Sequence, residues 1–211
     1  MIMMLRQKRL LIILMSLFGI VACAGMLDSN QPAERTYWLQ PLIVQSTETD
    51  KGSLPSLVVT VRAAPGLDSD RMLILESGAR LNHYAAARWP DNVPEVLESL
   101  LRRTVESTGD YARVSGRKGT RSADWQLELE VREFYTVAAS SAGTSKVRVA
   151  LSGYVNCHDT DHVISMLANV DLYDERLSVI VAAHEKAVHE VSKQLVSQLS
   201  LACGSNTYGI T

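Results

Sequence analysis

The stretch WQLELEVREF, residues 125–134, alternates apolar with polar side chains. Its alternate apolar side chains point to one side of an extended chain, as in a strand with one buried face. These side chains are Trp125, Leu127, Leu129 and Val131. Phe134 falls out of this phase. The stretch therefore predicts a half-buried strand with a bulge, or an end, near Arg132-Glu133.

Two further segments with the same alternation follow this strand. The first places its small and apolar side chains on one face at Val147, Val149, Leu151, Gly153, Val155 and Cys157. After a short loop, His158–His162, the second does the same at Ile164, Met166, Ala168, Val170 and Leu172. Short connections join neighbouring antiparallel strands. The three segments therefore predict an antiparallel meander.

The first half of the chain predicts a second group of strands. Tyr37-Trp38-Leu39 is the first candidate strand, and the β-branched run Leu57–Val61 predicts a strand that is buried on both faces. Arg71–Glu76 and Arg80–Ala85 predict a hairpin, which turns at Ser77-Gly78.

A helix is predicted after each strand group. Asn92 as N-cap, Pro94 in the first turn and Glu95 in a capping box predict a helix that ends at Gly109. Its apolar stripe is Val93, Val96, Leu97, Leu100, Leu101 and Val105. A closing helix is predicted from about Ser178 to Leu201. Its stripe is Val181, His184, Val188, Val191, Leu195 and Leu199. The predicted fold class is α+β, with two layers: antiparallel strands in two groups, and a helix after each group packed on one sheet face.

The N-terminal residues resemble a bacterial lipoprotein signal. Arg6, Lys8 and Arg9 precede 13 mainly apolar residues, Leu10–Ala22, and Cys23 follows directly. As a helix this run is roughly 20 Å long, too short for a hydrocarbon core of about 30 Å. We expect residues 1–22 to be a signal peptide and Cys23 to carry lipid. A plain secretory signal and a buried N-terminal helix are the alternatives.

The residues after Cys23 predict a tether and a destination. Residues 23–35 contain polar and helix-breaking side chains and predict a flexible tether with a reach of roughly 20 Å. Residues 36–203 then form a single periplasmic domain, and residues 204–211 form a C-terminal tail. In Gram-negative lipoproteins, Asp after the lipidated cysteine typically retains the protein at the inner membrane. Ala24 in that position implies the outer membrane.

The charge balance argues against some partners. The chain has 21 basic and 23 acidic side chains, and without the three basic residues of the signal its net charge is −5. An acidic domain without a concentrated Lys/Arg stretch argues against binding to nucleic acid or to anionic lipid surfaces. Membrane attachment then depends on the acyl chains, at about 0.8 kcal/mol for each buried methylene.

The cysteines predict one disulfide. Lipidation of Cys23 leaves Cys157 and Cys203 as an even pair in an oxidising compartment. Cys157 lies on the inward phase of its strand, and Cys203 follows the helix that must cover that face. We predict a Cys157–Cys203 disulfide, which contributes about 4 kcal/mol on the chain-entropy model. Two separate buried thiols are the alternative.

Two clusters contain residue types that bind metals. The hexapeptide CHDTDH, residues 157–162, is favoured as a polar turn, because consecutive ligands in a tight hairpin rarely converge on one ion. His184-Glu185 and His189 differ from a zinc-protease helix, whose histidines are four residues apart. The sequence has no Gly-x-Ser-x-Gly elbow and no Gly-rich phosphate loop. We expect no enzymatic activity, no cofactor and no metal.

Four motifs together resemble the ABC-type transport auxiliary lipoproteins, of which the paraquat-inducible Pqi-type lipoprotein is the best-known branch. They are Tyr37-Trp38-Leu39 soon after the cysteine, Arg80–Tyr84 leading to Arg88-Trp89, a helix ending in Thr108-Gly109-Asp110-Tyr111, and Ala123-Asp124-Trp125-Gln126-Leu127. The resemblance spans most of residues 36–201.

This resemblance implies a lipoprotein of the outer membrane that faces the periplasm. It would partner an MCE-domain protein that bridges the envelope, together with an inner-membrane permease and ATPase that move lipids. Association of the chain into a homo-oligomer is a further possibility. The family has no catalytic residues to carry over. Arg88 and Trp89 are the candidate partner contacts, with structural roles as the alternative. A stand-alone outer-membrane assembly or envelope-integrity lipoprotein is the alternative function.

Overall fold

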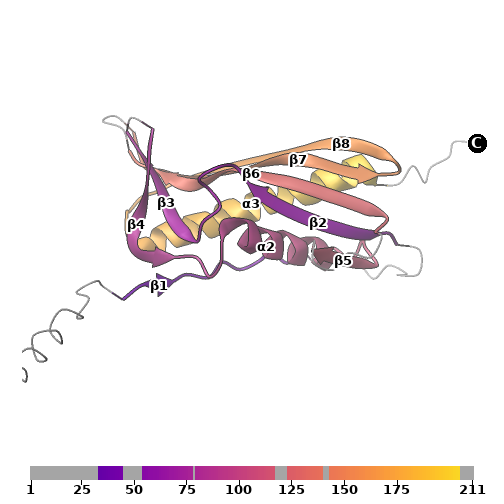
Figure 1. The fold of residues 1–211 in the computed structure, drawn as a ribbon, viewed down its shortest axis with the longest axis horizontal. Helices are drawn as coiled ribbons and strands as arrows, with labels where there is room; N and C mark the ends of the chain where they lie inside the picture. Colours follow the sequence, from indigo (N-terminus) through magenta and orange to yellow (C-terminus); the bar gives the residue numbers. More distant parts are fainter. Residues whose placement is uncertain (1–32, 45–53, 78, 117–122, 140–142, 205–211) are drawn as a thin grey trace, which may run out of the picture. The chain divides into compact units, whose positions relative to one another are not determined.

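The computed structural model describes residues 33–44, 54–77, 79–116, 123–139 and 143–204, and its folded domain begins at Glu34 (Figure 1). Cys23, the signal, most of the tether, the C-terminal tail and Gly78 of the predicted turn lie outside these residues. The elements are β1 Arg35–Thr36, β2 Ser56–Ala63, β3 Arg71–Glu76, β4 Arg80–Arg88, α2 Val93–Ser107, β5 Arg113–Gly116, β6 Trp125–Val137, β7 Lys146–Cys157, β8 Thr160–Asp171 and α3 Leu177–Cys203. Neither helix in the described ranges is long and apolar enough to cross a membrane.

The predicted meander is confirmed as β6, β7 and β8, which pair antiparallel in this order (Figure 1). The register of β6 against β7 shifts between Val131 and Glu133, which confirms the predicted bulge. The predicted loop His158–His162 is too long. Cys157 pairs directly with Thr160, and the two residues between them have positive φ angles of 53° and 55°. Two left-handed residues make the tight turn that suits the twist of a hairpin.

The two strand groups are joined into one mixed sheet by parallel pairs. β6 has β7 along one side, while β2 pairs with its first half and β3 with its end, both parallel to it. β5 pairs parallel to β2 on the other side of that strand. The α+β class is confirmed, and the antiparallel pairs are β3–β4, β6–β7 and β7–β8. β2 can pair parallel to β5 and β6 because the β3–β4 hairpin and α2 lie between them in the chain. This long connection returns the chain to the same end of the sheet.

The predicted strand Tyr37-Trp38-Leu39 is wrong. The first strand is β1, which pairs with the last two residues of β4. The Tyr37 N–H donates to the Arg88 carbonyl at 2.9 Å, and the pairing ends there because β4 itself ends at Arg88. Leu39 then turns into the core, while the side chain of Trp38 is 60% exposed. In β2, by contrast, Leu57, Val58 and Val59 are all buried, as predicted.

The predicted helix after the first strand group is α2, whose apolar stripe is buried throughout. Its predicted capping box is absent, because Asn92 makes no side-chain cap bond. The backbone N–H of Asn92 instead donates to the Asp91 carboxylate, and the Val93 N–H donates to the Ser69 carbonyl. The end of the helix is as predicted, with Gly109 at a φ of 77°.

Both helices pack on one face of the sheet. The inward side chains of β2, β6, β7 and β8 form a single cluster with those of α2 and α3. Every predicted stripe residue of α3 is buried except the half-buried Val181. The other face carries polar side chains such as Gln126, Glu128 and Glu130. The domain thus has one core between a helical layer and a sheet, as predicted.

Candidate functional site

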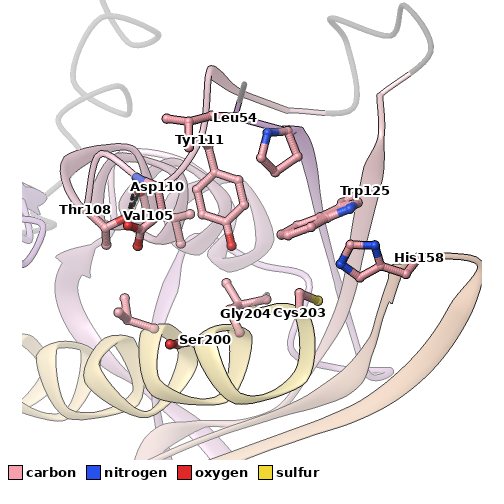
Figure 2. A pocket seen from close by; sticks show the side chains of 13 residues that line it. Leu54, Val105, Thr108, Asp110, Tyr111, Trp125, His158, Ser200, Cys203 and Gly204 are labelled. Carbon is pink, nitrogen blue, oxygen red and sulfur yellow. Dashed lines mark hydrogen bonds between the residues drawn. The ribbon is translucent and has the colours of Figure 1, made fainter. Parts of the chain in front are cut away.

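A cavity of about 480 Å³ opens where α2 and α3 end and β2 and β6 begin (Figure 2). Its apolar lining comes from Leu54, Pro55, Val105, Val196 and Leu199. Figure 2 shows the Tyr111 ring above the last turns of α3, with Trp125 and His158 on the neighbouring wall. The cavity is therefore built from chain segments that only the folded sheet brings together.

Three rings, of Tyr111, Trp125 and His158, form a cavity aromatic row. The ring centroids of Tyr111 and Trp125 are 5.8 Å apart, and those of Trp125 and His158 are 5.3 Å apart, both in edge-to-face contact. Local structure places each ring: Tyr111 follows the end of α2, Trp125 begins β6, and His158 lies in the two-residue turn. Tyr111 and Trp125 are half-buried and His158 is exposed, so the row borders an open hollow.

The polar groups of the cavity are held by burial and by local hydrogen bonds. Burial and the adjacent Asp110 carboxylate raise the pKa of Tyr111, which keeps its hydroxyl protonated. The Thr108 hydroxyl donates to the Val105 carbonyl at 2.9 Å and accepts the Asp110 N–H at 3.3 Å. Within the described part of the lining, no hydrogen bond joins a nucleophile to a base, as nucleophilic catalysis requires.

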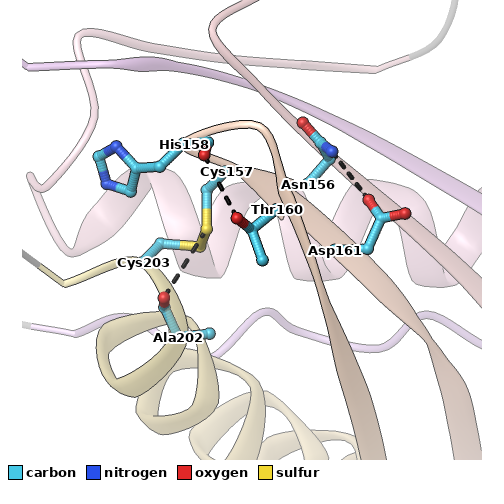
Figure 3. Close-up of a disulfide and its surroundings, with 7 residues drawn as sticks. All are labelled: Asn156, Cys157, His158, Thr160, Asp161, Ala202 and Cys203. Atoms are coloured by element: carbon cyan, nitrogen blue, oxygen red, sulfur yellow. Dashed lines mark hydrogen bonds between the residues drawn. A yellow bond between two sulfur atoms is a disulfide. The ribbon is translucent and has the colours of Figure 1, made fainter.

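The Cys157–Cys203 disulfide joins the end of β7 to the end of α3 (Figure 3), and Cys203 also lines the cavity. The two Cα atoms are 5.9 Å apart and the cysteines are 46 residues apart in sequence. Because Cys157 is in this bond and the His158 ring contacts Trp125, these two members of the hexapeptide 157–162 serve the fold. Among the residues that the structure describes, no three His, Cys, Asp or Glu side chains gather as metal ligands.

Asp124 gives the Ala-Asp-aromatic motif a structural role. Its carboxylate accepts hydrogen bonds from the N–H and the hydroxyl of Ser56, at 2.7 and 2.8 Å. These bonds join the first residue of β2 to the start of β6, and they lower the pKa of Asp124. The motif thereby sets the parallel register that places Trp125 beside the cavity.

Arg88 and Trp89, the candidate partner contacts, lie in different surroundings. Arg88 belongs to an exposed ion cluster: it pairs with Glu34 at 3.1 Å and with Asp70 at 3.4 Å, and Arg71 also pairs with Glu34 at 2.7 Å. Trp89 is 1% exposed and lies in the core, which is the structural alternative for this residue. Of the two, only Arg88 has a side chain that is partly exposed to solvent.

The two histidines of α3 are separated by the helix itself. His184 is buried, its Nδ1–H donates to the Ile180 carbonyl at 2.9 Å, and its ring contacts Trp89 and Phe134. Burial lowers the pKa of His184 to about 4. His189 instead donates from Nε2 to the Gln40 carbonyl. The pair therefore cannot bind one ion, in agreement with their spacing of five residues.

The family comparison agrees with this domain. The family model described as the ABC-type transport auxiliary lipoprotein component matches residues 37–196, from just after β1 to the last turns of α3. The chain belongs to this family. It is therefore an auxiliary lipoprotein of ABC-type transport, a cell-envelope role that points away from catalysis. None of the curated proteins compared with the auxiliary lipoprotein matches it in sequence.

Solved structures share the fold of the auxiliary lipoprotein. A DUF330 protein of Xanthomonas campestris matches with a TM-score of 0.67 and 21% identity, over 79% of this chain and 95% of that protein. An uncharacterized protein matches at 0.61 and 13%, over 80% and 100%. A hypothetical protein of Chlamydia trachomatis matches at 0.50 and 8%, over 72% and 100%. At these identities the likeness shows the fold alone.

Sequence reasoning missed the cavity. It quoted Tyr111 and Trp125 in two separate motifs and placed His158 in a polar turn, but it did not bring the three rings together. The available signal was that each ring lies at the end of a predicted element. Element ends meet at one rim of a two-layer domain, but which ends meet depends on strand order, which local pattern does not encode.

Proposed function

We propose that the protein is an accessory lipoprotein of an ABC/MCE-type lipid transport system, anchored in the outer membrane through Cys23 and facing the periplasm. It docks or supports the MCE-domain protein that spans the envelope, which in turn joins the inner-membrane permease and ATPase. Family membership over residues 37–196 is the observation that carries the proposal. The lipoprotein-like sequence that ends at Cys23 supports the anchor.

A docking role suits the described surface. Tryptophan, tyrosine and arginine side chains are the groups that most often dominate protein interfaces. The cavity aromatic row and Arg88 supply these two kinds of group. Both are therefore positions at which the MCE-domain protein would make contact.

The anchor is tested by labelling and fractionation. The chain is expected to incorporate labelled palmitate and to fractionate with the outer membrane. Cys23→Ala should lose the label. Ala24→Asp is the matched variant, because it should keep the label and move to the inner membrane. Equal labelling of Cys23→Ala would contradict lipidation at this residue, and an Ala24→Asp variant that stays in the outer membrane would contradict the sorting.

The partner is tested by crosslinking in cells. A photoreactive residue is placed at His158, at Arg88, or at Lys193 on the exposed side of α3, where the Lys193 side chain is 63% exposed. We expect an adduct with the MCE-domain protein from His158 or Arg88, and none from Lys193. Adducts with a permease component would still support a place in the transporter. Recovery of neither partner, with the protein folded and anchored, would reject the docking role.

A further inference from the structure

β8 is a long, regular strand at the border of the sheet. It has 12 residues in unbroken register with β7 and, among the residues that the structure describes, pairs with no second strand. The other border strands are short or irregular: β1 has two residues, β5 has four, and β4 contains a register shift with Ala86 at a φ of 56°. Short and bulged edges resist pairing with other chains, whereas a long regular edge invites it.

The hairpin geometry decides which backbone groups of β8 face outward. A two-residue turn makes Cys157 and Thr160 a hydrogen-bonded pair, so the even-numbered residues of β8 bond to β7. The odd-numbered residues then direct their N–H and C=O groups to the free edge. Ser165 and Leu167 lie at the centre of this row.

Two glutamines of α3 occupy these central groups. Gln194 accepts the Leu167 N–H at 3.1 Å and donates to the Leu167 carbonyl at 2.9 Å. Gln198 accepts the Ser165 N–H at 3.1 Å and donates to the Ser165 carbonyl at 2.8 Å. Each side-chain amide therefore makes the two bonds that a directly opposite residue of an antiparallel strand would make.

The spacing of the helix matches that of the strand. Four helical residues rise about 6 Å and two strand residues rise about 6.8 Å, so glutamines at i and i+4 meet alternate residues of β8. α3 runs antiparallel to β8, because the higher-numbered glutamine meets the lower-numbered strand residue. One turn earlier stands Glu190, which pairs with Lys193 and has no N–H to donate from its carboxylate.

Exposed apolar side chains of β8 give a reason why its free edge needs to be covered. Val163 is 84% exposed and Leu167 is 48% exposed. Both are odd-numbered residues of β8, whose side chains lie on the solvent-exposed face of the sheet. Apolar side chains along an open strand edge promote pairing between copies of a chain.

We propose that Gln194 and Gln198 act as a surrogate ninth strand that closes the β8 edge, preventing β8 from pairing with β8 of a second copy of this chain. A side-chain amide supplies both a donor and an acceptor, and in these two glutamines it reaches from the helix to the strand. This role is independent of the transport function proposed above, because it concerns only whether β8 can pair with another copy of the chain.

The test uses the full chain in detergent, with the wild type as the baseline for its mass. Gln194→Ala/Gln198→Ala should make the Ser165 and Leu167 amides exchange with solvent about tenfold faster. It should also add a concentration-dependent species of larger mass in sedimentation. Lys193→Ala/Ser197→Ala, on the exposed side of the same turns, should change neither. Gln194→Asn/Gln198→Asn keeps the amides but shortens their reach, and should behave like the alanine variant.

A charge at the edge distinguishes edge pairing from general loss of structure. Val163→Lys, added to Gln194→Ala/Gln198→Ala, should restore the wild-type mass while exchange at Ser165 and Leu167 stays fast. If the alanine and asparagine variants both keep the wild-type mass, the glutamines only hold α3 to the sheet and the proposal is overturned. It is likewise overturned if the larger species persists after Val163→Lys.

Discussion

Two aromatic clusters lie at opposite ends of β6, and they use similar residues in different ways. The core aromatic cluster, Trp89, Phe134 and His184, is buried, with ring centroids 5.2–5.5 Å apart. The cavity aromatic row, Tyr111, Trp125 and His158, has similar spacing but borders an open hollow of about 480 Å³. Similar ring contacts are therefore part of the packed core at one end and part of an open surface at the other, according to what surrounds them.

The bulge in β6 makes both clusters possible. Trp125 and Phe134 are nine residues apart, so in a regular strand they would face opposite sides of the sheet. The extra residue between Val131 and Glu133 returns Phe134 to the inward face. One strand thus contributes an aromatic ring to each cluster.

The largest expected effect is the loss of Trp89. Trp89→Ala should lower the free energy of unfolding by about 3–5 kcal/mol, because it leaves a cavity in a packed core. The matched change at the other end, Trp125→Ala, should cost about 1–2 kcal/mol, because that ring is only half-buried. Urea unfolding of both variants measures the difference. Equal costs would mean that the cavity row is as much a part of the core as the buried cluster.

The disulfide should have the next largest effect. Cys157→Ala/Cys203→Ala removes a bond that closes a long loop, and should lower the free energy of unfolding by about 2–4 kcal/mol. Reduced wild-type protein should unfold at nearly the same urea concentration as this variant. A variant as stable as the oxidised wild type would show that packing alone holds α3 against the cavity.

His184 should make stability depend on pH. Its pKa is about 4 in the folded protein and about 6.5 when unfolded, so its contribution is complete above about pH 6.5 and is lost as pH falls toward 4. Between about pH 7.5 and pH 4.5, the wild type should lose on the order of 2–3 kcal/mol more than His184→Gln. Identical pH profiles for wild type and His184→Gln would contradict this assignment.

The ion cluster around Arg88 should have the smallest effect on stability. Glu34→Gln removes ion pairs whose side chains are more than a third exposed, and should cost at most about 1 kcal/mol at low salt. Thermal unfolding at low and high salt measures this cost, which should shrink as salt rises. A larger cost, insensitive to salt, would mean that Glu34 anchors the start of the domain by packing.

Much of the fold could be predicted from local pattern. Alternation marked β6, β7 and β8 and the bulge near Arg132-Glu133, and helical spacing marked α2 and α3. The short β1 was missed because its position depends on where β4 ends, and Asn92 is the N-cap as predicted but makes no side-chain cap bond. The missed strand comes from a contact with residues distant in sequence.

The sequence by itself determined most of the elements, their buried faces and the pairing of two cysteines, because side-chain period and residue type act over a few neighbouring positions; β1 and β5 were not among the predicted strands. Only the tertiary structure decided that β2 and β3 share one side of β6 in parallel, that Tyr111, Trp125 and His158 line one cavity, and that Gln194 and Gln198 close the β8 edge. These features depend on strand order and on how α3 lies along the sheet. Such long-range contacts leave no period in the sequence.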